Sequence, residues 1–435
     1  MGLLAAVALL LAPRDARAAA AEARRARDAG GALGAPLLYA WTKWAAAAGI
    51  LVAALREPRP PAAPNGPDGR APRARRIDFF AWRPQSNATA RCRGAAYAPL
   101  LRERGITLRF LPPAPDRLYR ALSERRGAVR LFTKPLYYLI VLAVRIGQLL
   151  RSGGADAVIV QRELYPFGPP LLEGLLARRR VPLLYDFDDA LDQPPPHLRG
   201  FAYRFHDWSK FEKIARRARW LLAASPRLAA RGRRTGTPTL LLPTPVDTER
   251  IHPSAAPPRR RPPVWGWIGS GGNLTYLEQV TPQLRALQQR RGGVLRVISD
   301  RPFRAAGLRV ENVRWCLARE AEALWGCDVG LMPLTENEYA RAKGGHKILV
   351  YWAAGLPVIA SPVGVNAEMI SHGEDGLLAD GPAAWREALE RLAGDAALRR
   401  RMGARGRRKV VARYSQRACA RTLADLIDRV LCEEV

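Results

Sequence analysis

Short apolar runs alternate with amphipathic stretches along most of the chain, beginning at about residue 76. The runs are rich in Val, Ile and Leu, as is typical of strands buried on both faces of a sheet, and segments with helical spacing separate them. The strands that we expect are Ile77–Trp82, Ile106–Leu111, Ala157–Val160, Val181–Phe187, Trp220–Ala224 and Leu240–Leu242, followed by Val264–Ile268, Val294–Ser299, Val310–Trp315, Asp328–Met332 and Pro357–Ser361. This alternation predicts an α/β protein whose parallel sheets are covered by helices on both faces.

One Pro-rich segment divides the pattern into two series. Five of the twelve residues in 252–263 are Pro, so neither a helix nor a central strand can cross this linker. We therefore expect two tandem Rossmann-like, doubly wound domains, at 76–251 and 264–410. A ligand cleft should lie between them, at the carboxyl ends of their strands. Residues 411–435 predict a C-terminal helix, which could pack back on the first domain.

Two apolar stretches raise the question of a membrane. Within the N-terminal extension, 1–75, the stretch Leu37–Leu55 carries two Trp and one Lys, which suits a helix at a membrane interface. The alternative is a misjudged start codon and translated upstream sequence. Lys134–Leu150 is either a core helix of the first domain or a basic amphipathic helix on a membrane surface. It is too short and too charged at its ends to span a bilayer.

Charge and cysteine content narrow the class of protein. The 435 residues include 70 Lys and Arg against 39 Asp and Glu, a formal net charge of +31. Codon bias toward Arg explains part of this excess, and a basic face for an anionic membrane or substrate is the alternative. The sequence lacks zinc-finger spacing and the aromatic signature of RNA-binding domains, so we expect no nucleic-acid partner. Five scattered Cys without a CxxC predict neither a disulfide framework nor a zinc site, and favour a cytoplasmic location, free or peripheral on the inner face of the plasma membrane.

The stretch with the clearest chemistry is 339–376. Two adjacent glycines precede an apolar helix, and backbone amides at such a turn and at a helix N-terminus bind anions. Lysines at the same turn add positive charge suited to a diphosphate, although two solvated lysines at a helix start are the alternative. The residues concerned are Lys343, Gly344, Gly345, His346 and Lys347.

Further residues extend this pattern over the second domain. They are Ala353–Ser361, Gly364, Glu368, Gly373 and Gly376, together with Trp265–Ser270 and Asp328–Leu334. This set resembles the donor-binding region of GT-B glycosyltransferases of family 4. The resemblance implies the GT-B fold, a nucleotide-diphosphate sugar as donor substrate, no metal or other cofactor, and retention of the anomeric configuration. The donor-binding residues that it implies are Gly269, Ser270, Gly271, Gly344, Gly345, His346, Gly364 and Glu368.

The chain departs from that family at one pair of positions. Many members have two Glu eight residues apart, for the donor sugar and the ribose, where this chain has Ala342 and Val350. Neither side chain can accept a hydrogen bond from a hydroxyl. We therefore expect Lys343 and Lys347 to carry the catalytic charge that stabilises a leaving nucleoside diphosphate.

In the first domain, three carboxylates follow a buried strand in the run Tyr185-Asp186-Phe187-Asp188-Asp189. A divalent-metal motif, a group that orients or deprotonates the acceptor hydroxyl, and a helix-capping network all fit this run. We expect no metal, because the resemblance to GT-B enzymes implies that none is usually needed, and take Asp188 and Asp189 as catalytic candidates. Acceptor-binding candidates are Arg91 and Arg93, after the first strand, and Arg162, after the third.

These features predict a glycosyltransferase that moves a hexose from a nucleotide-diphosphate sugar to a hydroxyl acceptor. A glycan or lipid-linked acceptor of the cell envelope or of an exopolysaccharide is the expected partner. The alternatives are a nucleotide-sugar epimerase, a non-catalytic protein that binds a glycan or a partner enzyme, and a basic lipid or nucleic-acid binder.

Overall fold

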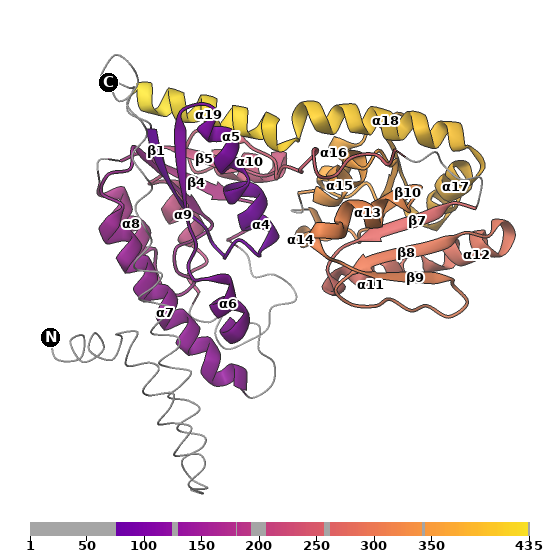
Figure 1. Cartoon of the computed structure of the whole chain (residues 1–435), viewed down its shortest axis with the longest axis horizontal. Coiled ribbons are helices and arrows are strands. Elements are labelled where there is room, and N and C mark those ends of the chain that lie inside the picture. Colours follow the sequence, from indigo (N-terminus) through magenta and orange to yellow (C-terminus); the bar gives the residue numbers. More distant parts are fainter. Residues whose placement is uncertain are drawn as a thin grey trace, which may run out of the picture.

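The computed structural model describes residues 75–123, 129–179, 181–192, 206–255, 262–341 and 344–433 (Figure 1). Nearly all of the N-terminal extension, the middle of the Pro-rich linker, Ala342 and Lys343 lie outside the described residues. No helix in the described part of the chain combines the length and apolar character needed to cross a membrane.

The first domain contains a parallel six-stranded sheet of order β2-β1-β3-β4-β5-β6. Its strands are β1 (Arg75–Phe80), β2 (Ile106–Leu111), β3 (Ala157–Gln161), β4 (Leu183–Phe187), β5 (Trp220–Ala223) and β6 (Thr239–Leu241). The helical segments are α4 (Ala88–Ala90), the π-helix η1 (Arg91–Ala95), α5 (Tyr97–Arg102), α6 (Asp116–Ser123), α7 (Val129–Arg151), α8 (Leu171–Ala177), α9 (Lys210–Ala215) and α10 (Pro226–Arg233).

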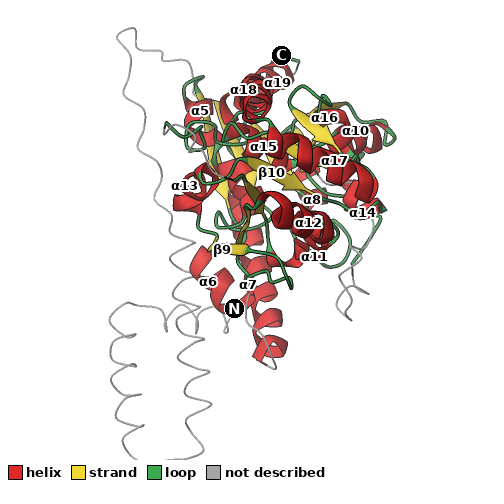
Figure 2. Cartoon of the chain, turned by 90° about the vertical axis from the view of Figure 1, so that its right-hand side faces the viewer, coloured by secondary structure: helices red, strands yellow, loops and turns green. Residues whose placement is uncertain are grey.

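The second domain repeats the plan with a parallel sheet of order β12-β11-β10-β7-β8-β9. Its strands are β7 (Val264–Ile268), β8 (Val294–Ser299), β9 (Val310–Arg314), β10 (Val329–Met332), β11 (Val358–Ala360) and β12 (Gly376–Leu378). The helices around them are α11 (Leu274–Glu278), α12 (Thr281–Arg291), α13 (Glu320–Trp325), α14 (Glu338–Arg341), α15 (His346–Ala353), α16 (Val365–Met369) and α17 (Gly381–Gly394). Figure 2 looks along this domain and shows helices on both sides of its strands.

The central strands of both sheets are buried on both faces, because they are almost wholly apolar, whereas no residue of the edge strands β6 and β9 is buried. In the first sheet, Phe79 and Ile159 face α5, whereas Phe80 and Val160 face the side covered by α8, α9 and α10. Every residue of β7 is buried. The predicted α/β class with two doubly wound units is therefore confirmed.

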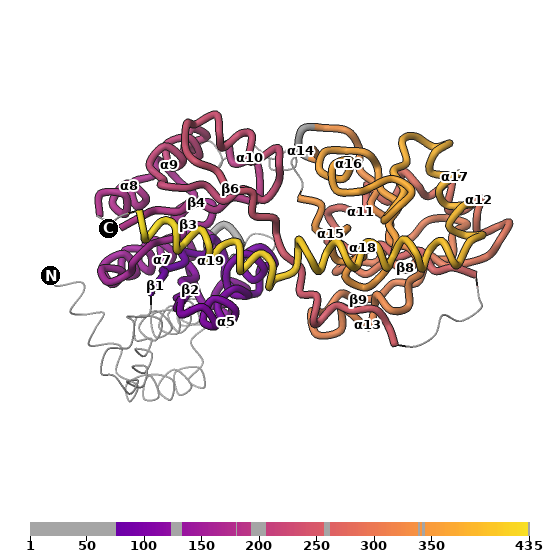
Figure 3. The backbone as a smooth tube through the Cα atoms, turned by 90° about the horizontal axis from the view of Figure 1, so that it is seen from above, coloured from indigo at the N-terminus to yellow at the C-terminus, as the bar shows by residue number. Residues whose placement is uncertain are grey.

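The chain crosses between the domains at two neighbouring places. Val246 pairs with Ser415, and the Val246 N–H donates to the Tyr414 carbonyl at 3.0 Å. Helix α18 (Ala396–Arg413) lies on the second domain and α19 (Gln416–Cys432) continues in line over the first (Figure 3). Ser415 caps α19, and Leu423 and Ile427 of α19 enter the core of the first domain.

The first crossing lies earlier in the chain than the expected linker. Ile251 is already part of the core of the second domain, and Arg250 donates to the Glu320 carboxylate of α13 at 2.7 Å. The Pro-rich segment therefore follows the crossing, and the residues just before it pack with the second domain.

Helix α7, which contains Lys134–Leu150, has one buried face and one exposed apolar face. One face is core, because Tyr137, Val141 and Val144 are buried. The opposite face is apolar yet exposed, with Leu139 62% and Leu150 77% accessible. The buried Arg145 donates to the carbonyls of Ala81, Leu111 and Leu164, which follow or end β1, β2 and β3, and so it fixes α7 at the carboxyl edge of the sheet.

Some local details differ from the sequence predictions. The expected helix Leu274–Arg291 is two helices, because Pro282 in the first turn of α12 cannot supply an amide hydrogen to a continuous helix. The expected helix Cys92–Arg104 is interrupted by η1, a π-helix, a form often found near functional sites. Strand β12 was not predicted, because three residues carry too little pattern.

Candidate functional site

A cavity of about 830 Å³ opens between the two domains. The first domain contributes α4, η1 and α5, and the second contributes the turn after β7, the loops after β8 and β9, and the start of α15. The cavity thus lies at the carboxyl ends of the strands, next to β7, where the order of the second sheet reverses. In open α/β sheets, ligands bind at such a switch point.

The turn after β7 and the first turn of α15 meet inside this cavity. The Lys347 ammonium lies 4.0 Å from the centroid of the buried Trp267 ring, which holds it by a cation–π interaction. A Cβ atom built on Gly269 would lie 2.7 Å from Lys347 Nζ. Only Gly lets the ammonium approach the backbone of the turn this closely, so a fixed positive charge lies beside a glycine turn.

Helix α15 begins at Gly345, whose φ of 66° is in the left-handed region that favours glycine. Among the residues that the structure describes, no side chain caps this helix. Burial lowers the pKa of His346, and its Nδ1 atom is buried without a hydrogen-bond partner in the described part of the chain. Uncapped amides and an unsatisfied ring nitrogen at the cavity wall suit an anionic, hydroxyl-bearing ligand.

The predicted donor residues are only partly brought together. Gly269, Ser270, His346 and Lys347 line the cavity, Gly271 and Gly345 are each next to a lining residue in the sequence, and Gly344 is not. The Gly271 N–H already donates to Asp300 at 2.6 Å. Gly364 and Glu368 are not among the residues that line the cavity, and Glu368 is exposed on α16. Lys343 lies outside the described residues.

Val350, which stands at a position where the family resemblance implies a Glu in many members, lines the cavity, and its side chain is 4% exposed. The wall of the same cavity also includes Glu320, whose carboxylate accepts hydrogen bonds from Trp315 Nε1 at 3.0 Å and from Arg250. Sequence reasoning missed this trio, because the three residues come from different loops and no local motif joins them.

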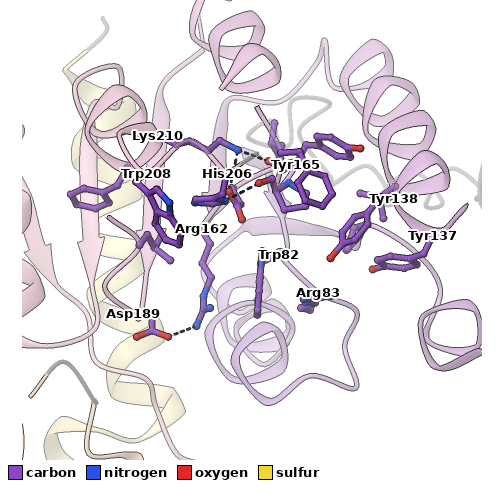
Figure 4. A pocket seen from close by; sticks show the side chains of 18 of the residues that line it. Trp82, Arg83, Tyr137, Tyr138, Arg162, Tyr165, Asp189, His206, Trp208 and Lys210 are labelled. Carbon is purple, nitrogen blue, oxygen red and sulfur yellow. Dashed lines mark hydrogen bonds and ion pairs between the residues drawn. The ribbon is translucent and has the colours of Figure 1, made fainter. Parts of the chain in front are cut away.

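A second cavity, of about 730 Å³, lies within the first domain (Figure 4). It sits where Trp82 follows β1 and Arg162 follows β3, which is the switch point of the first sheet. Aromatic side chains from α7 and from the segments after β3 and β4 contribute to its wall. The sequence signal was present in the aromatic residues 137, 138, 165 and 167, yet only the fold shows that they share one space.

Asp188 lies between the two cavities. Its carboxylate accepts from Arg162 Nε at 2.6 Å, in the first-domain cavity, and from Thr89 Oγ1 at 2.9 Å, on α4. Burial alone would raise the pKa of Asp188, but the charges of Arg162 and Arg93 and these hydrogen bonds outweigh it and lower the pKa overall. Asp188 is therefore an ionised, fully engaged carboxylate.

Asp189 and Arg162 face the first-domain cavity together. Arg162 Nη2 lies 3.6 Å from an Asp189 oxygen, and the Asp189 side chain is 31% exposed. Arg162 also stacks 4.1 Å from the Trp82 ring and has a φ of 59°, the single positive φ at a non-glycine residue in the described ranges. Such backbone strain is typical of functional sites.

Arg93 is not an acceptor contact, so that prediction is wrong. Its side chain is wholly buried and donates to the Asp186 carboxylate at 3.1 Å and to the carbonyl of Leu242. The pair ties η1 to β4 beneath the cavities. Arg91, in contrast, lines the interdomain cavity.

The carboxylates of the run 186–189 diverge rather than converge on one point. Asp186 is bonded to Arg93, and Asp188 to Arg162. In the part of the chain that the structure describes, no three His, Cys, Asp or Glu residues are placed to hold one metal ion.

Comparison with known proteins agrees with this architecture. This chain is similar to sucrose-phosphate synthase of Thermosynechococcus elongatus, at 15% sequence identity and a TM-score of 0.57, and the match covers 82% of this chain and 100% of that one. A glycosyltransferase of Rickettsia africae is similar at 12% sequence identity and a TM-score of 0.60, and the match covers 82% of this chain and 98% of that one. Anabaena HepE in complex with UDP is similar at 12% sequence identity and a TM-score of 0.55, and the match covers 82% of this chain and 100% of that one. No curated protein matches the sequence.

The fold therefore defines the class: this chain has the GT-B fold of glycosyltransferases. Residues 264–395, which make up most of the second domain, match the family model described as Glycosyl transferases group 1. The resemblance expected from the sequence is confirmed.

Proposed function

We propose that the chain transfers a sugar from a nucleoside-diphosphate sugar to a hydroxyl acceptor. The observation that carries this proposal is the meeting of the Gly269 turn and the Lys347 ammonium in the interdomain cavity. A diphosphate there would be held by backbone amides and one fixed cation, which would also stabilise the charge that develops on the leaving group.

The first domain would bind the acceptor. Asp189 is partly exposed in its cavity and is the better candidate to take the acceptor proton, because the low pKa of Asp188 makes that carboxylate a weak base. Asp188 would instead position Arg162 and, through Thr89, the cavity-lining segment α4.

The relatives support a nucleotide-sugar donor and an envelope setting. HepE has been crystallised with UDP and with UDP-glucose, and the similar WaaG takes part in lipopolysaccharide biosynthesis. We propose a hexose donor, a glycan or lipid-linked acceptor, and retention of the anomeric configuration. The anomeric proton coupling of the product in an NMR spectrum reports that configuration.

A thermal-stability screen tests the proposed function. Purified full-length protein is heated with UDP-, GDP-, ADP- and dTDP-sugars, since a ligand of the folded state raises the melting temperature. We expect one nucleotide series to stabilise the wild type and Lys347→Arg, but not Lys347→Met. Lys213→Met, an exposed lysine of α9, is the matched control and should behave as the wild type. Absence of stabilisation by every nucleotide sugar would refute the proposal.

Transfer is then measured with the stabilising donor. Loss of one charge-stabilising group should raise the activation barrier in Lys347→Met by about 2–4 kcal/mol. We propose that this cation makes a metal unnecessary, so the rate should persist in excess EDTA.

A second candidate, a donor-binding protein without transferase activity, is favoured by the apolar Val350 at the position of a family Glu. Nucleotide-sugar stabilisation without either transfer or hydrolysis in the presence of membrane extract would select this candidate.

A further inference from the structure

The wall of the first-domain cavity is built of aromatic rings in mutual contact. The ring centroids of Tyr138 and Phe167 lie 4.8 Å apart, those of Tyr137 and Tyr138 5.3 Å apart, and those of Tyr165 and Phe167 5.8 Å apart (Figure 4). These rings surround a space of about 730 Å³. An apolar cavity of this size with a few polar groups is the usual form of a small-molecule site.

Within the described part of the chain, the Arg83 cation of this wall forms no ion pair with an acidic side chain. Arg162 is paired with Asp188, and Lys210 with Glu163. The Arg83 guanidinium instead stacks on the Trp82 ring at 4.4 Å and lies 5.2 Å from the centroid of the Tyr119 ring. Among the described residues, no ion pair joins Arg83 to a carboxylate. An oriented guanidinium with unneutralised charge suits a phosphate.

The cavity opens onto exposed apolar surface. Leu139 of α7 lines the cavity and is 62% exposed. The same face of α7 continues with Ile146 and Leu150, and the adjacent α8 exposes Leu171 by 69% and Leu175 by 51%. Figure 1 shows α7 and α8 together at the outer side of the first domain. We call this surface, formed by Leu139, Ile146, Leu150, Leu171 and Leu175, the α7–α8 face.

The charges around the α7–α8 face are complementary to an anionic bilayer. Helix α7 contains no Asp or Glu, and Glu173, the one acid of α8, is buried and accepts from the Leu164 N–H. Arg151 and Arg178 are exposed beside Leu150 and Leu175. A face that combines exposed leucines with basic residues binds anionic membrane surfaces.

We propose that the first-domain cavity binds an acceptor whose phosphate is linked to a long isoprenoid-like chain. Arg83 holds the phosphate, the aromatic wall contacts the first part of the chain, and the chain leaves past Leu139 to a bilayer on the α7–α8 face. The part that accepts the sugar then points toward Asp189 and the donor cavity. This inference rests on the proposed function, of which it specifies the acceptor.

Binding of farnesyl phosphate tests the inference. The full chain is titrated with farnesyl phosphate, farnesol and inorganic phosphate while tryptophan fluorescence is followed, because Trp82 and Trp208 line the cavity. We expect farnesyl phosphate to bind, farnesol to bind about tenfold or more weakly, and inorganic phosphate alone to have no measurable effect, since a charged hydrogen bond and the chain both contribute.

Variants locate the site. Arg83→Gln should weaken farnesyl phosphate about tenfold and leave farnesol unchanged, whereas Arg234→Gln, an exposed arginine after α10, should change neither. The inference would be overturned if the wild type and Arg83→Gln bound farnesyl phosphate with equal affinity, or if the wild type bound farnesyl phosphate and inorganic phosphate with equal affinity. Donor stabilisation by a nucleotide sugar is measured on the same samples, so failure of the acceptor site and failure of the proposed function are distinguishable.

Vesicles separate a membrane-borne acceptor from a free one. With vesicles of phosphatidylglycerol and phosphatidylcholine that carry an undecaprenyl-phosphate-linked sugar, Leu150→Asp should lower the transfer rate several-fold, while Val411→Asp on α18, which is 42% exposed in the wild type, should not. Equal rates for both variants, or full activity with a chain-free sugar phosphate, would contradict the membrane side of the inference.

Discussion

At the residue scale, a buried ion pair holds the cleft edge of the first domain in place. Arg93 and Asp186 are 93 positions apart, and neither reaches solvent. Burial raises the pKa of Asp186 more than the Arg93 charge lowers it, so the pair is held by geometry and by further bonds to Gln161 and Leu242.

Removing one member of this pair should be costly. We expect Arg93→Met to lower the free energy of unfolding by about 3–5 kcal/mol, because it leaves a buried carboxylate without its partner. Arg104→Met, which breaks the exposed pair with Asp425, should cost less than about 1 kcal/mol. Urea denaturation measures both, and a cost for Arg93→Met no larger than that of the control would contradict the assignment.

The charge of Asp188 should appear in the dependence of stability on pH. The folded-state pKa of this carboxyl lies below its unfolded value, because Arg162, Arg93 and Thr89 outweigh burial. Its contribution is therefore fully present above the unfolded pKa, about 4, and is lost as the pH falls through the folded pKa. The stability difference between the wild type and Asp188→Asn should shrink between about pH 5 and pH 2. A difference that stays constant over this range, or grows, would refute the lowered pKa.

At the element scale, most strands were predictable because buried parallel strands are continuous apolar runs, as in Val264–Ile268. The exposed and buried faces of α7 could not be assigned from the sequence, because both are apolar. The π-helix η1 has no known local signature, and the burial of Arg93 depends on a strand far away in the chain. The positions of the side chains in the site could therefore be determined only from the tertiary structure.

Helix α19 should be needed for the stability of the first domain. Leu423 is buried between this helix and the sheet, so Leu423→Ala should lower the free energy of unfolding by about 2–4 kcal/mol through cavity formation. Val411→Ala on the exposed side of α18 is the matched control and should change the free energy by less than about 0.5 kcal/mol. Chemical denaturation compares them, and equal effects would show that α19 does not complete the core.

At the scale of the whole molecule, neither domain forms the donor cavity alone. Arg91 and Cys92 come from the first domain, and Gly269 and Lys347 from the second. The tandem domains and the glycine turn were predictable from the sequence, because each leaves a local pattern. The convergence of Gly269 on Lys347 was not, since it depends on the distance between two loops and on the Trp267 ring beneath them.

The most direct test of the diphosphate site compares UDP with uridine by isothermal titration calorimetry, in the wild type, Lys347→Met and Gly269→Ala. Uridine lacks the phosphates, so its affinity should be the same in all three proteins. UDP should bind the wild type at least about tenfold more tightly than either variant, because Lys347→Met removes the cation and Gly269→Ala displaces it. Equal UDP affinity in the three folded proteins would contradict the account.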